Sequence, residues 1–287
     1  MNDVYRYARV LTIAGSDSGG GAGIQADLKT FAALGCYGMS AITALTAQNT
    51  VGVQAIHGVP PEFLKAQIQS VVEDIGVDAV KVGMLHSPGM VEVVAWAIAH
   101  YRLPHVVLDP VMVATSGDRL ITSDTVQVLV EQLFPLASVI TPNLDEAALL
   151  LGRDIPNAQA LDAAAQDLLA MGAQAVLLKG GHLAGQEVVD LLVQAQGQAD
   201  GPQRLASPRI ASRNVHGTGC TLSSATAAHL ALGHSLSDAV HHARSFILSA
   251  IAQGADVSTG QGHGPLNHGF APQALHRITK PPSTVKT

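Results

Sequence analysis

Residues 216–220 combine a histidine, two glycines and a cysteine at the predicted start of a helix. The first backbone N–H groups of a helix lack internal partners, and the helix macrodipole is positive there. Gly217 and Gly219 could therefore bring bare amides up to a phosphoryl oxygen. The same field is expected to lower the pKa of the Cys220 thiol and to favour thiolate. The motif predicts an anion site beside a base, which is the chemistry of phosphoryl transfer to a hydroxyl.

Other polar groups favour this anion site over the simpler alternative, a glycine-rich turn followed by a buried cysteine. Lys179 ends an apolar strand and could place an ammonium beside a phosphate, or it could be an ordinary snorkelling lysine. Asn143 and Glu146 lie one helical turn apart and could hold magnesium, although their spacing alone favours a helix cap. Asp109 closes a buried strand and is the second metal candidate; its alternative role is to start a turn before proline.

A glycine-rich run at residues 15–23 follows the first predicted strand. Residues 21–26 formally satisfy the relaxed dinucleotide fingerprint, but no acidic residue ends the second strand to hold a ribose. A P-loop is also absent, because Lys29 lacks the glycine that this motif requires before it. We therefore expect a turn that lets the backbone approach a small ligand, with Asp27 accepting a hydrogen bond. The alternatives are an ordinary tight turn and, for Asp27, a charge that complements the helix dipole.

Composition excludes several classes of protein. The chain has 287 residues and is 47% hydrophobic, enough for a large α/β core. Its net charge of −6 and the lack of a dense basic cluster argue against a nucleic-acid partner. Two cysteines are too few for a disulfide framework, and no apolar run is long enough to cross a bilayer. We expect a cytoplasmic protein with no membrane partner.

Short apolar runs alternate with longer segments of helical period, which predicts a doubly wound, mainly parallel sheet with helices on both faces. One domain over residues 1–287 is expected, with flexible ends at 1–8 and 278–287. Strands are predicted at 10–14, 40–46, 77–82, 106–109, 138–141 and 175–179, with a hairpin over 187–205. Helices are predicted at 24–34, 61–75, 90–101, 123–134, 144–151 and 158–171, with two more after residue 217.

Ligands of doubly wound sheets bind beyond the carboxyl ends of the strands. Polar or flexible groups follow the predicted strands at residues 15–23, 48–49, 83–84, 109–112, 141–143 and 179–182. We expect the site at this edge. The 13 histidines show no metal-ligand spacing and no Gly-x-Ser-x-Gly elbow occurs, so zinc chemistry and acyl hydrolysis have no support.

Eight ordered motifs together resemble those of the bacterial hydroxymethylpyrimidine/phosphomethylpyrimidine kinases of thiamine biosynthesis: residues 14–27, 47–50, 81–85, 109–112, 116–118, 141–146, 179–182 and 216–221. The resemblance covers residues 8–270. It implies the ribokinase-like fold in three layers, and phosphorylation of 4-amino-5-hydroxymethyl-2-methylpyrimidine and then of its monophosphate. It also implies ATP and Mg²⁺ as cofactors and a homodimer as the assembly.

The resemblance implies a role for individual positions. Cys220 takes the place of the catalytic base, where sugar kinases of the superfamily carry aspartate, and the amides around Gly217 and Gly219 form the anion hole. The implied pyrimidine contacts are Gly15, Ala22, Asp27, Gln48, Met84 and Val111. We assign ATP contacts to Lys179, Thr218 and Asn143, and magnesium to Glu146 and Asp109. Residues 51–59 are expected to help cover the substrate.

Two positions depart from the family pattern. Ser18 and Gly19 replace a proline and a serine, which should loosen the glycine-rich turn. Thr115 replaces a lysine and removes one possible phosphate contact. Three other functions remain as alternatives: a pyridoxal kinase, which shares the fold; a sugar or nucleoside kinase, disfavoured because Cys220 is not aspartate; and a pyrimidine-sensing protein without activity, which would have no need to keep Lys179, Glu146 and Cys220 together.

Overall fold

The computed structural model describes residues 5–112, 121–181, 183, 185–195 and 201–279. The 116–118 motif, Thr115 and His182 lie outside the described residues. No described helix is both long enough and apolar enough to cross a membrane.

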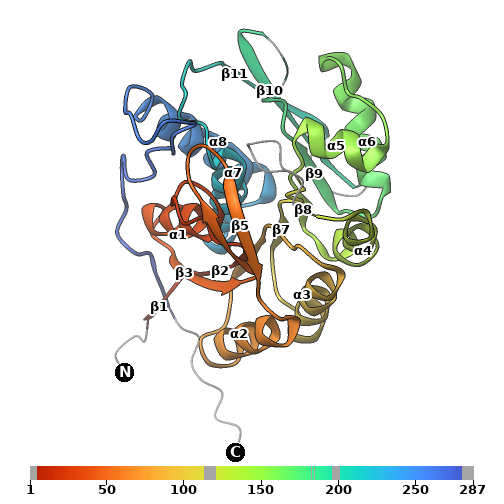
Figure 1. Cartoon of the computed structure of the whole chain (residues 1–287), viewed down its shortest axis with the longest axis vertical. Coiled ribbons are helices and arrows are strands. Elements are labelled where there is room, and N and C mark those ends of the chain that lie inside the picture. Colours follow the sequence, from red (N-terminus) through yellow and green to blue (C-terminus); the bar gives the residue numbers. More distant parts are fainter. Residues whose placement is uncertain (1–4, 113–120, 182, 184, 196–200, 280–287) are drawn as a thin grey trace, which may run out of the picture.

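An eight-stranded sheet runs through the middle of the molecule in the order β11-β10-β9-β8-β7-β6-β2-β3 (Figure 1). The strands from β9 to β3 are parallel, whereas β10 and β11 are antiparallel additions at one edge. The strand bounds are β2 (Arg9–Ala14), β3 (Tyr37–Ile42), β6 (Ala79–Val82), β7 (Val106–Leu108), β8 (Val139–Ile140), β9 (Ala175–Leu178), β10 (Glu187–Gln194) and β11 (Gln203–Pro208). This confirms the predicted doubly wound sheet, and β10 and β11 confirm the predicted hairpin.

Helices cover both faces of the sheet, so the fold has three layers (Figure 1). One apolar core lies under α2 (Pro61–Asp74), α3 (Pro88–Tyr101), α4 (Ser123–Leu133), α5 (Leu144–Leu151) and α6 (Leu161–Ala170). The other lies under α1 (Gly23–Ala33), α7 (Thr218–Ala231) and α8 (Leu236–Ala252). Two short 3₁₀ turns, Phe134–Leu136 and Ala158–Ala160, complete the described helical segments. The second of them replaces the first turn of the predicted 158–171 helix, because Asn157 caps a 3₁₀ turn there.

The predicted strand at 40–46 is wrong as a single element. The chain leaves β3 at Thr43, whose hydroxyl donates a hydrogen bond to the Met84 carbonyl at 2.8 Å. It then continues as β4 (Ala44–Gln48), which pairs antiparallel with β5 (Val53–Gly58) in a separate two-stranded sheet. Apolar patterning could not reveal this break, because it depends on contacts with the loop after β6. The β4–β5 pair forms one wall of the pocket described below.

The two ends of the described chain also pair with each other. Strand β1 (Tyr5–Tyr7) runs antiparallel to β12 (Arg277–Thr279), and Arg6 forms an ion pair with Asp78 at 2.5 Å. Residues 5–7 and 278–279, which belong to the segments expected to be flexible, are therefore paired in strands. The rest of the two predicted flexible segments, apart from Ala8, lies outside the described residues.

A pair of phenylalanines tests where the core lies. Phe31 on α1 is fully buried, whereas Phe63 on α2 is 60% exposed. We expect Phe31→Ala to lower the free energy of unfolding by about 3–5 kcal/mol, because it leaves a cavity between α1 and the sheet. Phe63→Ala should change it by less than about 0.5 kcal/mol. Urea denaturation measures both values; similar losses for the two variants would contradict this assignment of the core.

Candidate functional site

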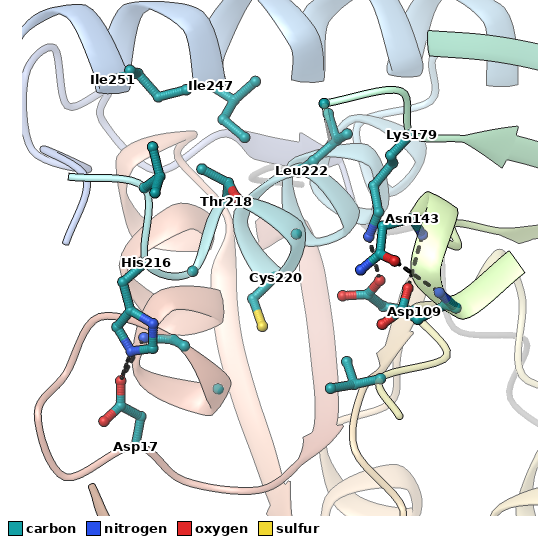
Figure 2. Close-up of a pocket in the computed structure, with 18 of the residues that line it drawn as sticks. Asp17, Asp109, Asn143, Lys179, His216, Thr218, Cys220, Leu222, Ile247 and Ile251 are labelled. Carbon is teal, nitrogen blue, oxygen red and sulfur yellow. Dashed lines mark hydrogen bonds and ion pairs between the residues drawn. The ribbon is translucent and has the colours of Figure 1, made fainter. Parts of the chain in front are cut away.

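A pocket of about 650 Å³ opens at the carboxyl ends of the parallel strands, between α7, the β4–β5 pair and the loops after β2, β7, β8 and β9. Figure 2 shows its interior. The structure brings together every predicted site residue except Asp27. The residues that line the pocket include Gly15, Ala22, Gln48, Met84, Asp109, Val111, Asn143, Glu146, Lys179, Gly217, Thr218, Gly219 and Cys220.

Helix α7 begins at the centre of the pocket. Gly217, its N-cap, has a φ of 83°, in the left-handed region that favours glycine. A Cβ atom there would overlap the carbonyl oxygen of Gly21, so the two glycine motifs touch backbone to backbone. Helical bonding starts with the Thr221 N–H, which donates to the Gly217 carbonyl at 2.9 Å. The amides of Gly219 and Cys220 precede that bond, and the predicted helix start is confirmed.

The Cys220 side chain points into the pocket from the first turn of α7 (Figure 2). Burial raises the pKa of its thiol to about 11, Lys81 lowers it, and Asp27 and Asp109 raise it further. The expectation of a lowered pKa is therefore wrong, because the loss of solvation outweighs the field of the helix start. Near neutral pH this cysteine is a thiol.

Lys179 and Asp109 contact each other in the pocket, to one side of Cys220 (Figure 2). The lysine ammonium donates to Asp109 Oδ1 at 2.8 Å, and its side chain is only 12% exposed, which rules out the snorkelling alternative. Burial would raise the pKa of Asp109, but Lys179 and Lys81 hold it below its usual value. A Cβ atom on Gly219 would lie 3.1 Å from the Lys179 Nζ atom. The ammonium is thus beside the helix start, as an anion site requires.

Asn143 and Glu146 form a capping box at the start of α5. The Asn143 side chain accepts from the Glu146 N–H at 2.9 Å, and Glu146 Oε2 accepts from the Asn143 N–H at 2.8 Å. This confirms the structural alternative, yet both residues also line the pocket. Burial raises the pKa of Glu146 to about 7, with Lys179 lowering it and Asp109 raising it. A buried carboxyl group of this kind would be stabilised in its ionised form by a nearby cation.

The chemistry of these donors fits magnesium. Mg²⁺ is usually held by one or two protein carboxylates together with waters and substrate phosphates. Asp109 and Glu146 supply two carboxylates beside the anion site. Within the part of the chain that the structure describes, no group of three or more histidine, cysteine, aspartate or glutamate side chains could hold a metal by itself. A metal here would therefore depend on phosphate oxygens for the rest of its ligands.

Asp27 is a correction to the predicted substrate contacts. Its side chain is fully buried below the pocket. One oxygen accepts from Ser224 at 2.6 Å, and the other accepts from Thr12 at 2.6 Å and from Lys81 at 3.0 Å. Asp27 is therefore not among the residues that line the pocket, and it contacts the other elements from below it. The alternative role as a helix-dipole charge is also wrong, because Asp27 lies beyond the first turn of α1, which has no acidic residue.

An Asp17–His216 pair was not among the predicted site residues, although both belong to the two glycine motifs. His216 Nε2 lies 2.8 Å from Asp17 Oδ2 (Figure 2). Burial would raise the pKa of Asp17, but His216 and the N–H groups of Ala22 and Gly19 hold it below its usual value. Asp17 thus joins the loop after β2 to the start of α7.

Gln48 lies next to this pair and to the departure at residue 18. Its Nε2 atom is 3.5 Å from His216 Nε2. Its backbone N–H donates to the Ser18 hydroxyl at 2.8 Å, and the Ser18 hydroxyl lies 2.8 Å from the Gln48 carbonyl. Ser18 therefore fastens the glycine-rich turn to β4, in place of the expected loosening.

The other end of the pocket is largely apolar. Leu222, Ile247 and Ile251 from α7 and α8 face it together with Thr218 (Figure 2). A buried ion pair between Arg244 and Asp190, at 2.8 Å, also lines the pocket. Neither residue of the pair had a sequence signal. The pocket therefore has a polar end around Cys220 and an apolar end that could take a flat heterocycle.

Comparisons with known proteins agree with this geometry. The family model for phosphomethylpyrimidine kinase matches residues 17–267. The hydroxymethylpyrimidine/phosphomethylpyrimidine kinase of Rhizobium meliloti is 51% identical over 262 residues, which cover 91% of this chain and 97% of that protein. The thiamine biosynthesis bifunctional protein ThiED of Geobacter sulfurreducens is also 51% identical, and the match covers 90% of this chain but only 52% of that protein.

Solved structures give the same result. A phosphomethylpyrimidine kinase from Clostridium difficile is 43% identical and matches 85% of this chain and 99% of its own, with a TM-score of 0.74. A pyridoxal kinase from Bacillus subtilis, solved with ADP, is 39% identical and matches 92% of this chain and 98% of its own, with a TM-score of 0.84. The ribokinase-like fold is thereby confirmed. Since the family model and relatives of about half-identical sequence span most of its length, the chain belongs to the phosphomethylpyrimidine kinase family.

Proposed function

We propose that this protein transfers the γ-phosphoryl group of ATP to 4-amino-5-hydroxymethyl-2-methylpyrimidine and then to the resulting monophosphate. The observation that carries the proposal is the start of α7, where Cys220 and the first-turn amides share one pocket with the Lys179–Asp109 pair. A hydroxyl acceptor can lie beside the sulfur while a phosphoryl group lies between the amides and the ammonium. Family membership supports the choice of substrate.

The reaction we propose is an in-line transfer in which positioning and charge stabilisation supply most of the catalysis. The hydroxymethyl oxygen bonds to the γ-phosphorus as the bond to the ADP oxygen breaks. Cys220 takes or shares the hydroxymethyl proton, and the amides near Gly219 and the Lys179 ammonium stabilise the transferring group. Asp109 orients Lys179 through the 2.8 Å ion pair.

The apolar end of the pocket is the proposed adenine site. Leu222, Ile247 and Ile251 offer apolar contact, and Thr218 lies between them and the anion site. Solved structures of pyridoxal kinases that resemble this chain are complexes with ADP and with AMP-PCP, which supports the use of ATP. Asp109 and Glu146 would hold Mg²⁺, which neutralises phosphate charge when bound. The homodimer, the single-domain organisation and the cytoplasmic location stay predictions from the sequence.

Pyridoxal phosphorylation is the second candidate function. The observation that favours it is the TM-score of 0.84 with the Bacillus subtilis pyridoxal kinase, higher than the 0.74 with the Clostridium difficile phosphomethylpyrimidine kinase. The same pocket could hold either flat ring. The two substrates differ at the ring edge, since only the pyrimidine carries the 4-amino group.

Cys220→Ala tests the proposed base. We expect kcat to fall roughly 10²–10⁴-fold while substrate affinity changes little, because the variant removes proton transfer and leaves the binding groups in place. Steady-state kinetics with Mg-ATP and the hydroxymethylpyrimidine measure it. Cys36→Ala is the matched control, since Cys36 is buried in the core between α1 and α7 and should leave kcat unchanged. Near-normal turnover in Cys220→Ala would leave the helix amides as the catalytic element.

Gly219→Val tests the anion site. The added Cβ would lie 3.1 Å from Lys179 Nζ and 3.7 Å from Asp109 Oδ2, so a branched side chain should displace the ammonium. We expect kcat/KM for ATP to fall by about 10²-fold, comparable to the loss of one transition-state donor. Gly201→Val is the control, because no atom lies within 4 Å of a Cβ built at Gly201. If both folded variants keep wild-type kcat/KM, phosphate binds elsewhere.

Gln48→Leu distinguishes the two candidate substrates. The Gln48 amide has both a donor and an acceptor and lies at the pocket beside His216, where it could pair with the aminopyrimidine edge. Its loss should lower kcat/KM for the pyrimidine by the equivalent of about 1–3 kcal/mol, because a buried polar edge of the substrate would lose its partner. The value of kcat/KM for pyridoxal should fall less. Equal losses for the two substrates would make Gln48 a structural residue.

A further inference from the structure

Two lysine–aspartate–serine chains meet the first two turns of α7 directly below Cys220. Ser223 and Ser224 follow Cys220 by three and four residues, so the three side chains share one side of the helix. In the first chain, the Ser223 hydroxyl lies 3.3 Å from Asp109 Oδ2 and 3.0 Å from the carbonyl oxygens of Gly219 and Cys220, and Asp109 Oδ1 accepts from the Lys179 of the proposed anion site.

The second chain has no role in the reaction proposed above. The Ser224 hydroxyl donates to Asp27 Oδ1 at 2.6 Å, and Asp27 Oδ2 accepts from the Lys81 ammonium at 3.0 Å. Both charged side chains are completely buried. A fully buried lysine is rare, and those that occur are paired. Its place in the middle of the sheet, on β6, therefore calls for an explanation.

The Lys81 ammonium is joined through Asp27 to Ser224, which lies one helical turn after Cys220 on α7. Lys81 lines the same pocket as Cys220. A Cβ atom on Gly83 would lie 2.9 Å from Lys81 Nζ, so the glycine after β6 leaves the space that this ammonium occupies. The ammonium has three protons, and Asp27 is its one hydrogen-bond acceptor among the described residues.

The charges around Cys220 come from four elements. They are Lys81 on β6, Asp27 on α1, Asp109 after β7 and Lys179 after β9. Burial raises the pKa of the Cys220 thiol, and Lys81 is the strongest influence that lowers it. Burial would lower the pKa of Lys81, but Asp27 and then Cys220 and Asp109 hold it above its usual value. The two groups therefore favour each other's charged forms.

We propose that Lys81 is a positioning residue for phosphoryl transfer: its ammonium, fixed by Asp27, stabilises the thiolate of Cys220. This inference rests on the proposed function. The thiol loses its proton to water, and the thiolate then takes the hydroxymethyl proton as the oxygen bonds to the γ-phosphorus and the bond to ADP breaks. Cys220 ends the cycle as a thiol, and ADP leaves with the electron pair of the broken bond.

The test measures the pKa of Cys220 directly, without substrate. In a Cys36→Ala background Cys220 is the one remaining cysteine of the chain, so the rate of alkylation by iodoacetamide against pH reports its thiolate fraction. We expect Lys81→Met to raise the thiol pKa by about one unit or more, and Asp27→Asn to lower it, because the two charges act in opposite directions. A role confined to holding the fold together would not shift the two variants in opposite directions.

The pH profile of kcat is the second readout. In Lys81→Met the rising limb of this profile should move to higher pH. The value of kcat at pH 8 should fall roughly tenfold, because a rise of about one unit in the thiol pKa makes the thiolate fraction tenfold smaller. Because removal of one partner from a buried pair can unfold a protein, Lys81→Met/Asp27→Asn removes both charges together. In that double variant the thiol pKa should still rise, since Lys81 is the larger influence.

An unchanged thiol pKa in the folded single variant and the double variant would overturn the inference, as would a kcat profile that does not move. Failure of the proposed function is a different result. In that case the wild-type protein would not phosphorylate the pyrimidine, whereas the alkylation profiles would still report whether Lys81 acts on Cys220.

Discussion

The contact on which the site depends is the backbone approach between Gly217 and Gly21. Any Cβ atom at Gly217 would overlap the Gly21 carbonyl, and one at Gly21 would lie 2.5 Å from the His216 ring. These two glycines are far apart in the sequence, and their contact places the start of α7 over the loop after β2. The Asp17–His216 pair then fixes the orientation of the two segments at 2.8 Å. Without this approach the cysteine and the glycine-rich loop could not border one pocket.

The interior of the site combines strong burial with nearly balanced charge. Lys81 with Asp27 and Lys179 with Asp109 are two neutral pairs, and each aspartate is held by a serine of α7. Removing ions from water costs free energy, and the hydrogen bonds within and around each pair offset that cost. Two groups lack an ion-pair partner of this kind: burial raises the pKa of Cys220 to about 11 and that of Glu146 to about 7. Binding of a cation or a phosphate would change the charge around these two groups.

The sequence predicted local features well and non-local ones poorly. Helix α5 has the predicted bounds, because its capping box and the left-handed Gly152 at its end are encoded within ten residues of chain. The break at Thr43 was missed, because it depends on a hydrogen bond to Met84. The errors on Asp27 and on the Cys220 pKa have the same origin. Both depend on what surrounds a side chain in three dimensions, namely Lys81, Ser224 and the depth of the pocket floor.

The antiparallel pairing of β1 with β12 has a consequence for how this fold can be extended. Tyr5 is the partner of Thr279, so the polypeptide enters and leaves the fold at neighbouring points on its surface. Strand β1 lies near β3 (Figure 1), and no residue of β1 or β12 is among those that line the pocket. A second unit joined to the chain beyond either strand would therefore attach away from the residues that line the pocket. The bifunctional relative, of which the match covers 52%, shows that such a fusion is compatible with this family.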